Sequence, residues 1–425
     1  MKKIRLLTLA AVAFMGLTAC GGNTPSSSQD PTSQQPTSQD PSSEPATSED
    51  TSAKPYEGVK VGLICLHPAA SSTYDKNFRE AFEAAADKLG FTPIVRENID
   101  ESDDCQTCAE QMAEDGCKLV FADSFGHEDY MMAAAENYPD VYFCHATGTQ
   151  AATSDLPNFG DAFASIYEGR YLAGVTAGLK LLDLYGDDIT DEEAKVGYVG
   201  AFPYAEVKSG YTSWFLGLRS VVSNATMEVT FTNSWYDENA EKEAANLLIG
   251  RGAKLISQHA DSYGAPNACE QANIPNVSYN GSTEAQCPNT FLVSSKINWQ
   301  PYYEHAIECY FNEELTLEKD YVGTVETGSV QLTDFGAACA EGTAEYVENV
   351  KAELAAGTRH IFDVNSFTVG GEEPSEANVA PDKQWTFDYP DGTLFLRGGF
   401  YNESVYRSAP SFDVDIDGIF NIDNN

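Results

Sequence analysis

Residues 59–90 read VKVGLICLHPAASSTYDKNFREAFEAAADKLG and contain one complete strand, loop and helix. The run 59–66 is short and apolar, which predicts a buried strand. Residues 75–89 are predicted to form a helix, because an apolar face repeats at helical spacing through Phe78, Phe82, Ala85 and Leu89. Gly90 follows as a helix stop. This is a βα unit of the kind that builds parallel sheets.

The same alternation continues along the chain. Further strands are predicted at 118–123, 141–146, 195–201, 227–233, 254–259, 276–279 and 291–295, with helical patterns between most of them. This order predicts an α/β protein with two doubly wound, parallel-sheet lobes covered by helices. The pattern at 167–184 predicts a long helix that bridges the lobes at a hinge, because residues 186–193 after it are acidic and polar.

The start of the chain is typical of a secretory signal. A basic beginning precedes an apolar stretch, residues 6–19, that is too short to span a bilayer stably. The motif LTAC at 17–20 is similar to a bacterial lipobox. We therefore expect residues 1–19 to be a lipoprotein signal peptide and Cys20 to carry lipid. The alternative is an ordinary signal peptide with a coincidental cysteine.

The rest of the chain divides by composition. Residues 20–54 hold Ser, Thr, Pro, Gln and acidic residues with almost nothing apolar, which predicts a disordered tether. The remainder is longer than one core usually supports, so two lobes are expected. Asp391-Gly392 is a hairpin signal. The predicted parts are lobe 1 at 55–185, lobe 2 at 194–295, a return segment at 296–370 that completes the lobes, and a C-terminal extension with the hairpin at 371–425.

The net charge of −40 at pH 7 restricts the partners. Nucleic acid and anionic lipid are both negatively charged, so the sequence argues against either of them. We interpret the excess of acid as a source of solubility. Beyond the signal, no apolar run approaches the ~20 residues that a membrane-spanning helix needs. The folded part is therefore expected to be soluble and held near the membrane.

The nine cysteines beyond Cys20 are compatible with disulfides or with buried free thiols. Cys105 and Cys108 form a C-x-x-C at a predicted helix start, either a redox-active pair or a local bridge. The other possible bridges join Cys269 with Cys287 and Cys309 with Cys339.

Metal-binding patterns are weak. The C-x-x-C has no second Cys or His pair, so a zinc site is not predicted. Asp413, Asp415, Asp417 and Gly418 resemble the start of a calcium-binding loop. The twelfth position of that loop is Asn424, where calcium binding requires a bidentate Glu. We expect no metal.

Aromatic residues stand beside short polar ones at the ends of most predicted strands. Ligands of open parallel sheets bind beyond the carboxyl ends of their strands. The set suits a flat heteroaromatic ligand, because rings stack on its faces while Asn and Asp side chains contact its edges. Each ring alone is more typical of a core, but their repetition at one end of the sheets favours a binding site. These candidate ligand contacts are Tyr74, Phe125, His145, Phe202, Trp235, Asp261 and Asn280.

Several longer motifs occur in one collinear order between about residues 60 and 418. They include Ser124-Phe125-Gly126, His145-Ala146-Thr147-Gly148, Tyr167-Glu168-Gly169-Arg170, Val196-Gly197-Tyr198-Val199-Gly200, Asn233-Ser234-Trp235, Gln258-His259-Ala260-Asp261-Ser262 and Asn298-Trp299. By these motifs the chain resembles the basic membrane protein family of substrate-binding lipoproteins, which serve ABC transporters and bind purine nucleosides or bases. It is most similar to a branch of purine-base binders.

The resemblance implies a type I periplasmic-binding-protein-like fold, no enzymatic activity and no cofactor. It also implies an ABC permease as partner and a lipid-anchored position on the extracytoplasmic face of the cell membrane. It adds Trp299 to the candidate contacts. The expected function is capture of an adenine-like purine base by aromatic stacking and lobe closure.

Three other functions stay open: a purine nucleoside-binding protein of the same transporter class, a cell-surface enzyme acting on nucleosides, and a lipoprotein with a sensor or adhesion role. The chain lacks a nucleophile signature such as G-x-S-x-G, which counts against the enzyme.

Two departures from the family pattern concern the ligand. Nucleoside-binding members carry an Asp where this chain has Thr147 and a Lys where it has Ile297. Lys296 is one position away, and adjacent residues of a strand face opposite sides. If those charged groups bind ribose, their replacement favours a free base. A third departure, Asn280 in place of an acidic residue, offers both a donor and an acceptor to a purine edge.

Overall fold

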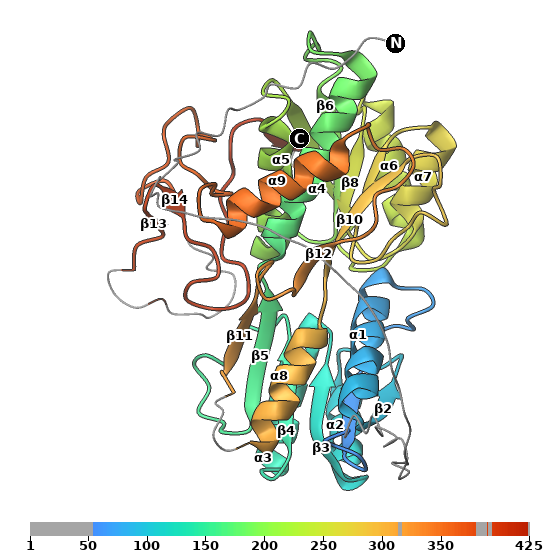
Figure 1. Cartoon of the computed structure of the whole chain (residues 1–425), viewed down its shortest axis with the longest axis vertical. Helices are drawn as coiled ribbons and strands as arrows, with labels where there is room; N and C mark the ends of the chain where they lie inside the picture. Colours follow the sequence, from blue (N-terminus) through green and yellow to red (C-terminus); the bar gives the residue numbers. More distant parts are fainter. Residues whose placement is uncertain (1–53, 313–316, 380–388, 390–392, 424–425) are drawn as a thin grey trace, which may run out of the picture. The chain divides into compact units, whose positions relative to one another are not determined.

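The structure is a computed structural model that describes residues 54–312, 317–379, 389 and 393–423. Within these residues two mainly parallel sheets are covered by helices, as Figure 1 shows, so the predicted α/β class is confirmed. The N-terminal signal, Cys20 and most of the predicted tether lie outside the described residues. Among the described helices, none combines the length and hydropathy needed to cross a membrane.

The first sheet has the strand order β11-β5-β4-β3-β1-β2, and its strands pair in parallel throughout. Its strands are β1 (Lys60–Ile64), β2 (Thr92–Arg96), β3 (Cys117–Ala122), β4 (Tyr142–Ala146), β5 (Phe159–Ala164) and β11 (Asp320–Gly323). Helices α1 (Thr73–Leu89) and α8 (Gln300–Phe311) pack together over one apolar core of this sheet. Helices α2 (Asp103–Glu114) and α3 (Glu128–Asn137) enclose another core.

The second sheet has the order β12-β10-β9-β8-β6-β7-β15. Its strands are β6 (Lys195–Gly200), β7 (Thr226–Phe231), β8 (Ile256–His259), β9 (Asn276–Tyr279), β10 (Phe291–Ile297), β12 (Val330–Leu332) and β15 (Ile419–Asn421). The pairing of β12 with β10 is antiparallel, and the other pairings are parallel. One core includes residues of α4 (Ile166–Tyr185), α5 (Ala205–Arg219) and α9 (Thr343–Ala355), and another includes residues of α6 (Glu238–Gly250) and α7 (Gly264–Ala272).

The long helix predicted at 167–184 is α4, and it packs closely against α5. A Cβ on Gly174 would lie 1.9 Å from the carbonyl oxygen of Trp214, so this crossing requires glycine. The chain passes between the sheets in three places: from β5 into α4, from β10 into α8, and from β11 into β12. Each sheet is therefore completed by a segment that returns late in the sequence.

The strands missing from the prediction lie mainly at sheet edges. β2 contains Pro93 and has no fully buried residue, so it lacks the apolar run by which the buried strands are found. β5 is fully buried but is interrupted by Gly160 and Asp161. The predicted hairpin at Asp391-Gly392 lies largely outside the described residues. Described residues nearby form a different hairpin, β13 (Leu396–Arg397) with β14 (Phe400–Tyr401).

The cysteines of the C-x-x-C motif, Cys105 and Cys108, are buried thiols on α2. Burial raises the pKa of both thiols, which disfavours the thiolate that redox exchange requires. Cys269, Cys287 and Cys339 are thiols as well, so the two longer bridges are absent from this structure.

Candidate ligand-binding site

A pocket of about 400 Å³, including its mouth, lies at the carboxyl ends of the strands of both sheets. The strand order of the first sheet reverses between β1 and β3, and that of the second sheet reverses between β6 and β8. Ligands of doubly wound folds bind at such switch points. The pocket is lined by Leu66, His67, Tyr74, Asp75, Ser124, Phe125, Thr147, Glu206, Trp235, His259, Asp261 and Tyr279.

The start of helix α1 forms one wall of the pocket. Ser72 caps the helix: its hydroxyl accepts from the N–H of Asp75 and donates to the Asp75 carboxylate. The carboxylate also accepts from the N–H of His67 at 2.7 Å. The hydroxyl of Tyr74 donates to the carbonyl of Asp123. These bonds fix the loop after β1 and bring Tyr74 and Asp75 to the pocket.

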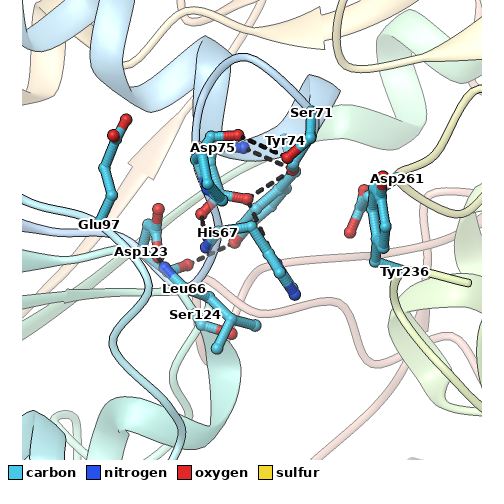
Figure 2. A network of polar contacts seen from close by, with 12 residues as sticks. Leu66, His67, Ser71, Tyr74, Asp75, Glu97, Asp123, Ser124, Tyr236 and Asp261 are labelled. Carbon is cyan, nitrogen blue, oxygen red and sulfur yellow. Dashed lines mark hydrogen bonds and ion pairs between the residues drawn. The ribbon is translucent and has the colours of Figure 1, made fainter.

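The carboxyl groups of Asp75 and Asp123 lie beside this wall, and Figure 2 shows both near His67. Burial disfavours charge on Asp75, but hydrogen bonds from His67 and Ser72 outweigh it and lower the pKa of Asp75. Burial and then the charge of Asp75 raise the pKa of Asp123 well above its ordinary value. Asp123 therefore holds a proton beside an ionised Asp75, and the pair carries one negative charge.

Loops of the two sheets touch around the pocket. The rings of His67 and Tyr236 stack with centroids 5.3 Å apart. The N–H of Thr73 in the first wall donates to the carbonyl of Asp261, 3.2 Å away, in the loop after β8. Both sheets thus contribute to one site.

Aromatic rings dominate the opposite wall. Trp235 is half-buried after β7, with its ring against Phe202 and near His259. The Nε2 of His259 lies 3.3 Å from a carboxylate oxygen of Glu206. Burial lowers the pKa of His259 although Glu206 acts in the opposite direction, so a neutral imidazole donates to Glu206. Tyr279 packs on the His259 ring, with centroids 4.2 Å apart.

Asp261 is a buried acid of the lining. Burial, then the nearby charges of Asp75, Glu241 and Glu206, raise the pKa of Asp261 well above its ordinary value. Asn280 donates to its Oδ1 at 3.3 Å, and Oδ2 has no hydrogen bond from a described residue. A ligand with N–H groups would supply the missing donor.

Four of the eight predicted contacts line the pocket: Tyr74, Phe125, Trp235 and Asp261. Two others support the wall from behind, since Phe202 packs on Trp235 and Asn280 donates to Asp261. His145 is fully buried, and its Nε2 donates to the carbonyl of Ser124 at 2.7 Å. Trp299 is 2% exposed and stacks on Phe78, with centroids 4.4 Å apart. His145 and Trp299 are therefore not pocket residues.

The prediction did not single out several lining residues. Glu206 is in the first turn of α5, Asp75 is in the first turn of α1, and Tyr279 is the last residue of β9. The two acids could have been found from their place in the first turn of a helix that follows a switch-point strand. The start of such a helix lies at the same edge of the sheet as the strand ends, where ligands bind. The lining contains three carboxyl groups and no Lys or Arg among the described residues, so it favours donors over phosphates.

Comparison with known proteins agrees with this geometry. Residues 59–363 match the model of a family described as ABC transporter substrate-binding protein PnrA-like. A purine-binding protein of Brucella abortus is 30% identical over 332 residues, which are 77% of this chain and 90% of that protein. A putative ABC transporter glucose-binding protein of Haloferax volcanii is 32% identical over 290 residues, covering 64% of this chain and 70% of that protein.

The fold is also similar to solved structures. A solute-binding protein of an ABC transporter system from Conexibacter woesei aligns with a TM-score of 0.57 at 21% identity, covering 71% of this chain and 98% of that one. The matching family comprises substrate-binding proteins of transporters rather than enzymes, which confirms the predicted absence of enzymatic activity. With a family match across most of the folded chain and a relative matched over nearly its full length, this protein belongs to the PnrA-like family of ABC transporter substrate-binding proteins.

Proposed function

We propose that this protein captures a purine base, adenine or a close analogue, and delivers it to an ABC permease. The observation that carries the proposal is the pocket itself, where aromatic rings and three carboxyl groups from both sheets surround one space. Purines offer flat faces for stacking and N–H donors for the acids. The Brucella relative, described as purine-binding, supports this ligand class.

Capture works through closure. Tyr74 and Phe125 come from the first sheet, while Trp235 and Asp261 come from the second. A ligand that contacts both sets is bound more tightly when the loops of the two sheets approach, so it stabilises the closed state. The permease would then receive a closed, loaded protein.

The positions at which nucleoside-binding members carry charged residues favour a free base over a nucleoside as the ligand of this protein. Ile297 is 2% exposed in the core of the first sheet and does not line the pocket. Lys296 lines a separate surface depression with Asn77 and Glu80. Thr147 lines the pocket but carries no charge. Ribose hydroxyls would therefore lack the two charged partners that nucleoside binders carry at the positions of Thr147 and Ile297.

A free base is expected to bind at least about tenfold tighter than its nucleoside, because a lost charged hydrogen bond costs roughly 1.5–3 kcal/mol. Isothermal titration of adenine against adenosine, and of guanine or hypoxanthine against guanosine or inosine, measures this ratio. Glucose is the matched negative ligand, since one relative is described as glucose-binding. Equal or tighter binding of the nucleoside would rule out a free base as the preferred ligand. Binding of glucose without binding of any purine would rule out purine capture.

We also propose that Cys20 anchors the protein by lipid to the extracytoplasmic face of the cell membrane. The lipobox-like LTAC motif before a polar tether supports this assignment. Cys20→Ala is expected to release the protein into the medium or leave an uncleaved precursor. Metabolic labelling with a fatty-acid analogue, followed by fractionation, tests it, and unlabelled wild-type protein would contradict the anchor.

A further inference from the structure

A second cluster of ionisable side chains lies in the first sheet, apart from the pocket lining. Glu128 is the first residue of α3, His145 lies on β4, and Asp161 lies on β5. All three are at least nine-tenths buried, and each places a ligand atom within 4.8 Å of the others. Neither a purine contact nor catalysis uses this cluster.

An imidazole nitrogen and two carboxyl groups face one another here. The carbonyl of Ser124 can only accept, so His145 Nε2 carries the proton of that 2.7 Å bond. In neutral imidazole, Nδ1 then presents a lone pair, and it faces Asp161 Oδ1 at 3.2 Å. Metal-binding histidines characteristically donate their other N–H to a carbonyl in this way, which fixes the ligating nitrogen.

Backbone N–H groups hold the two carboxyl groups in place as well. Glu128 accepts from the N–H groups of Thr149 and Gln150, both at 2.7 Å, and Asp161 Oδ2 accepts from the N–H of Ala151. Within the described residues, no Lys or Arg forms an ion pair with either carboxylate. Burial raises the pKa of both carboxyl groups, so without a cation the pair keeps a proton, and a bound metal ion would take its place.

Gly148 allows the three ligand atoms to converge. A Cβ there would lie 2.3 Å from Asp161 Oδ1, 2.5 Å from Glu128 Oε1 and 2.5 Å from His145 Nδ1. A side chain at this position would push the three atoms apart, so their convergence requires glycine. Ligands about 2.0–2.2 Å from a zinc ion lie roughly 3–4 Å from one another, as His145 Nδ1 and Asp161 Oδ1 do at 3.2 Å.

We propose that Glu128, His145 and Asp161 bind a small divalent transition-metal ion, with Zn²⁺ as the best match. Two carboxylates and one imidazole suit Zn²⁺ or Mn²⁺ better than the oxygen-only shells of calcium. The ion would join α3, β4, β5 and the loop 147–151. Thr147, which lines the pocket, has φ 70°, a strained value for a β-branched residue that firm support from this loop would maintain.

The test uses full-length protein without an affinity tag, stripped with a chelator, dialysed and titrated with Zn²⁺ or with Mn²⁺ in the absence of purine. We expect uptake of about one Zn²⁺ per chain and a higher melting temperature. Loss of a residue that only supports a metal ligand costs roughly 10- to 100-fold in metal affinity. Glu128→Gln and Asp161→Asn each change a direct ligand, so each should lower the affinity for the metal at least about 100-fold. Using two conservative variants protects the test against one that fails to fold.

Two control variants locate the site. Glu318→Gln removes an exposed carboxylate 2.7 Å from His305, a His–acid pair that belongs to neither three-residue cluster found among the described residues. Cys65→Ser alters the other buried cluster, Cys65, Asp75 and Asp123. Both controls should keep wild-type metal affinity. The proposal is overturned if wild-type protein takes up neither metal, if uptake persists in Glu128→Gln and Asp161→Asn, or if Cys65→Ser abolishes it. Because no purine is present, these outcomes are independent of the proposed function.

Discussion

Replacing Trp235 with alanine is expected to weaken purine binding by about 5- to 150-fold while the protein stays folded. Base–aromatic stacking contributes roughly 1–3 kcal/mol per contact by alanine substitution in nucleic-acid binders. Trp235 is half-buried and lines the pocket, so its indole is available to a ligand. Its ring packs edge-on against Phe202, at 65° between planes, which fixes the indole in place before the ligand arrives.

Trp299→Phe is the matched control, because it also removes an indole. Trp299 stacks on Phe78 in the core and does not line the pocket, so this variant should retain wild-type affinity. Isothermal titration with adenine gives the affinities, and circular dichroism checks the fold. A folded Trp235→Ala protein with unchanged affinity would assign Trp235 to packing, and a binding loss confined to Trp299→Phe would reverse the two roles.

The fold could be predicted because its signals are local and repeated. Buried parallel strands such as β3 and β4 are mostly apolar runs flanked by helical periodicity, and the predicted bounds lie close to the observed ones. Edge strands such as β2 and β15 carry no such signal. Their pairing is decided by distant segments, as when β15, near the end of the chain, adds to β7.

The pocket could be predicted in outline because strand ends converge at one edge of each sheet. Tyr74, Phe125, Trp235 and Asp261 all lie there. The strand-end rule does not give the direction of a side chain, and His145 does not line the pocket for this reason. Its ring turns into the sheet toward Asp161, sixteen residues later on the neighbouring strand. Trp299 lies away from the pocket for another reason: it precedes α8, and that helix packs on α1.

The charges of the site could not be predicted from sequence at all. Asp75 and Asp123 are far apart in the chain, and their opposite pKa shifts arise only when folding buries them side by side. The same holds for Asp261, whose neighbours Asp75, Glu241 and Glu206 come from three different segments. Residue types therefore indicated acceptors, while the fold determines which of them are ionised before a ligand binds.

Asp261→Asn is expected to weaken adenine binding and, at the same time, to stabilise the ligand-free protein at neutral pH. The carboxylate is the acceptor proposed for purine N–H groups, and a hydrogen bond to a charged group is worth roughly 1.5–3 kcal/mol, so affinity should fall about 10- to 150-fold. The amide keeps the size of the side chain and its place beside Asn280. Loss of binding would thus reflect chemistry rather than a cavity.

The stability effect follows from the raised pKa of Asp261. The unfolded chain releases this proton near the ordinary value of about 3.9, while the folded protein holds it to higher pH. Between the two values the folded state binds more protons, so ligand-free stability falls as pH rises through that window. Asp261→Asn removes the ionisable group, so the variant should not lose stability in this way as pH rises. Its melting temperature should exceed that of wild type at pH 7, and the difference should disappear as pH falls below about 4.

Asp188→Asn, in the exposed loop after α4, is the matched control and should change neither affinity nor melting temperature appreciably. Thermal melts from pH 4 to pH 8, with and without adenine, separate the two effects. Wild-type affinity in Asp261→Asn would place the purine edge against another acid, with Glu206 the next to test. A lower melting temperature at pH 7 would mean that Asp261 is ionised and stabilising in the ligand-free protein, so that the hydrogen bond from Asn280 outweighs burial and the repulsion of the surrounding acids.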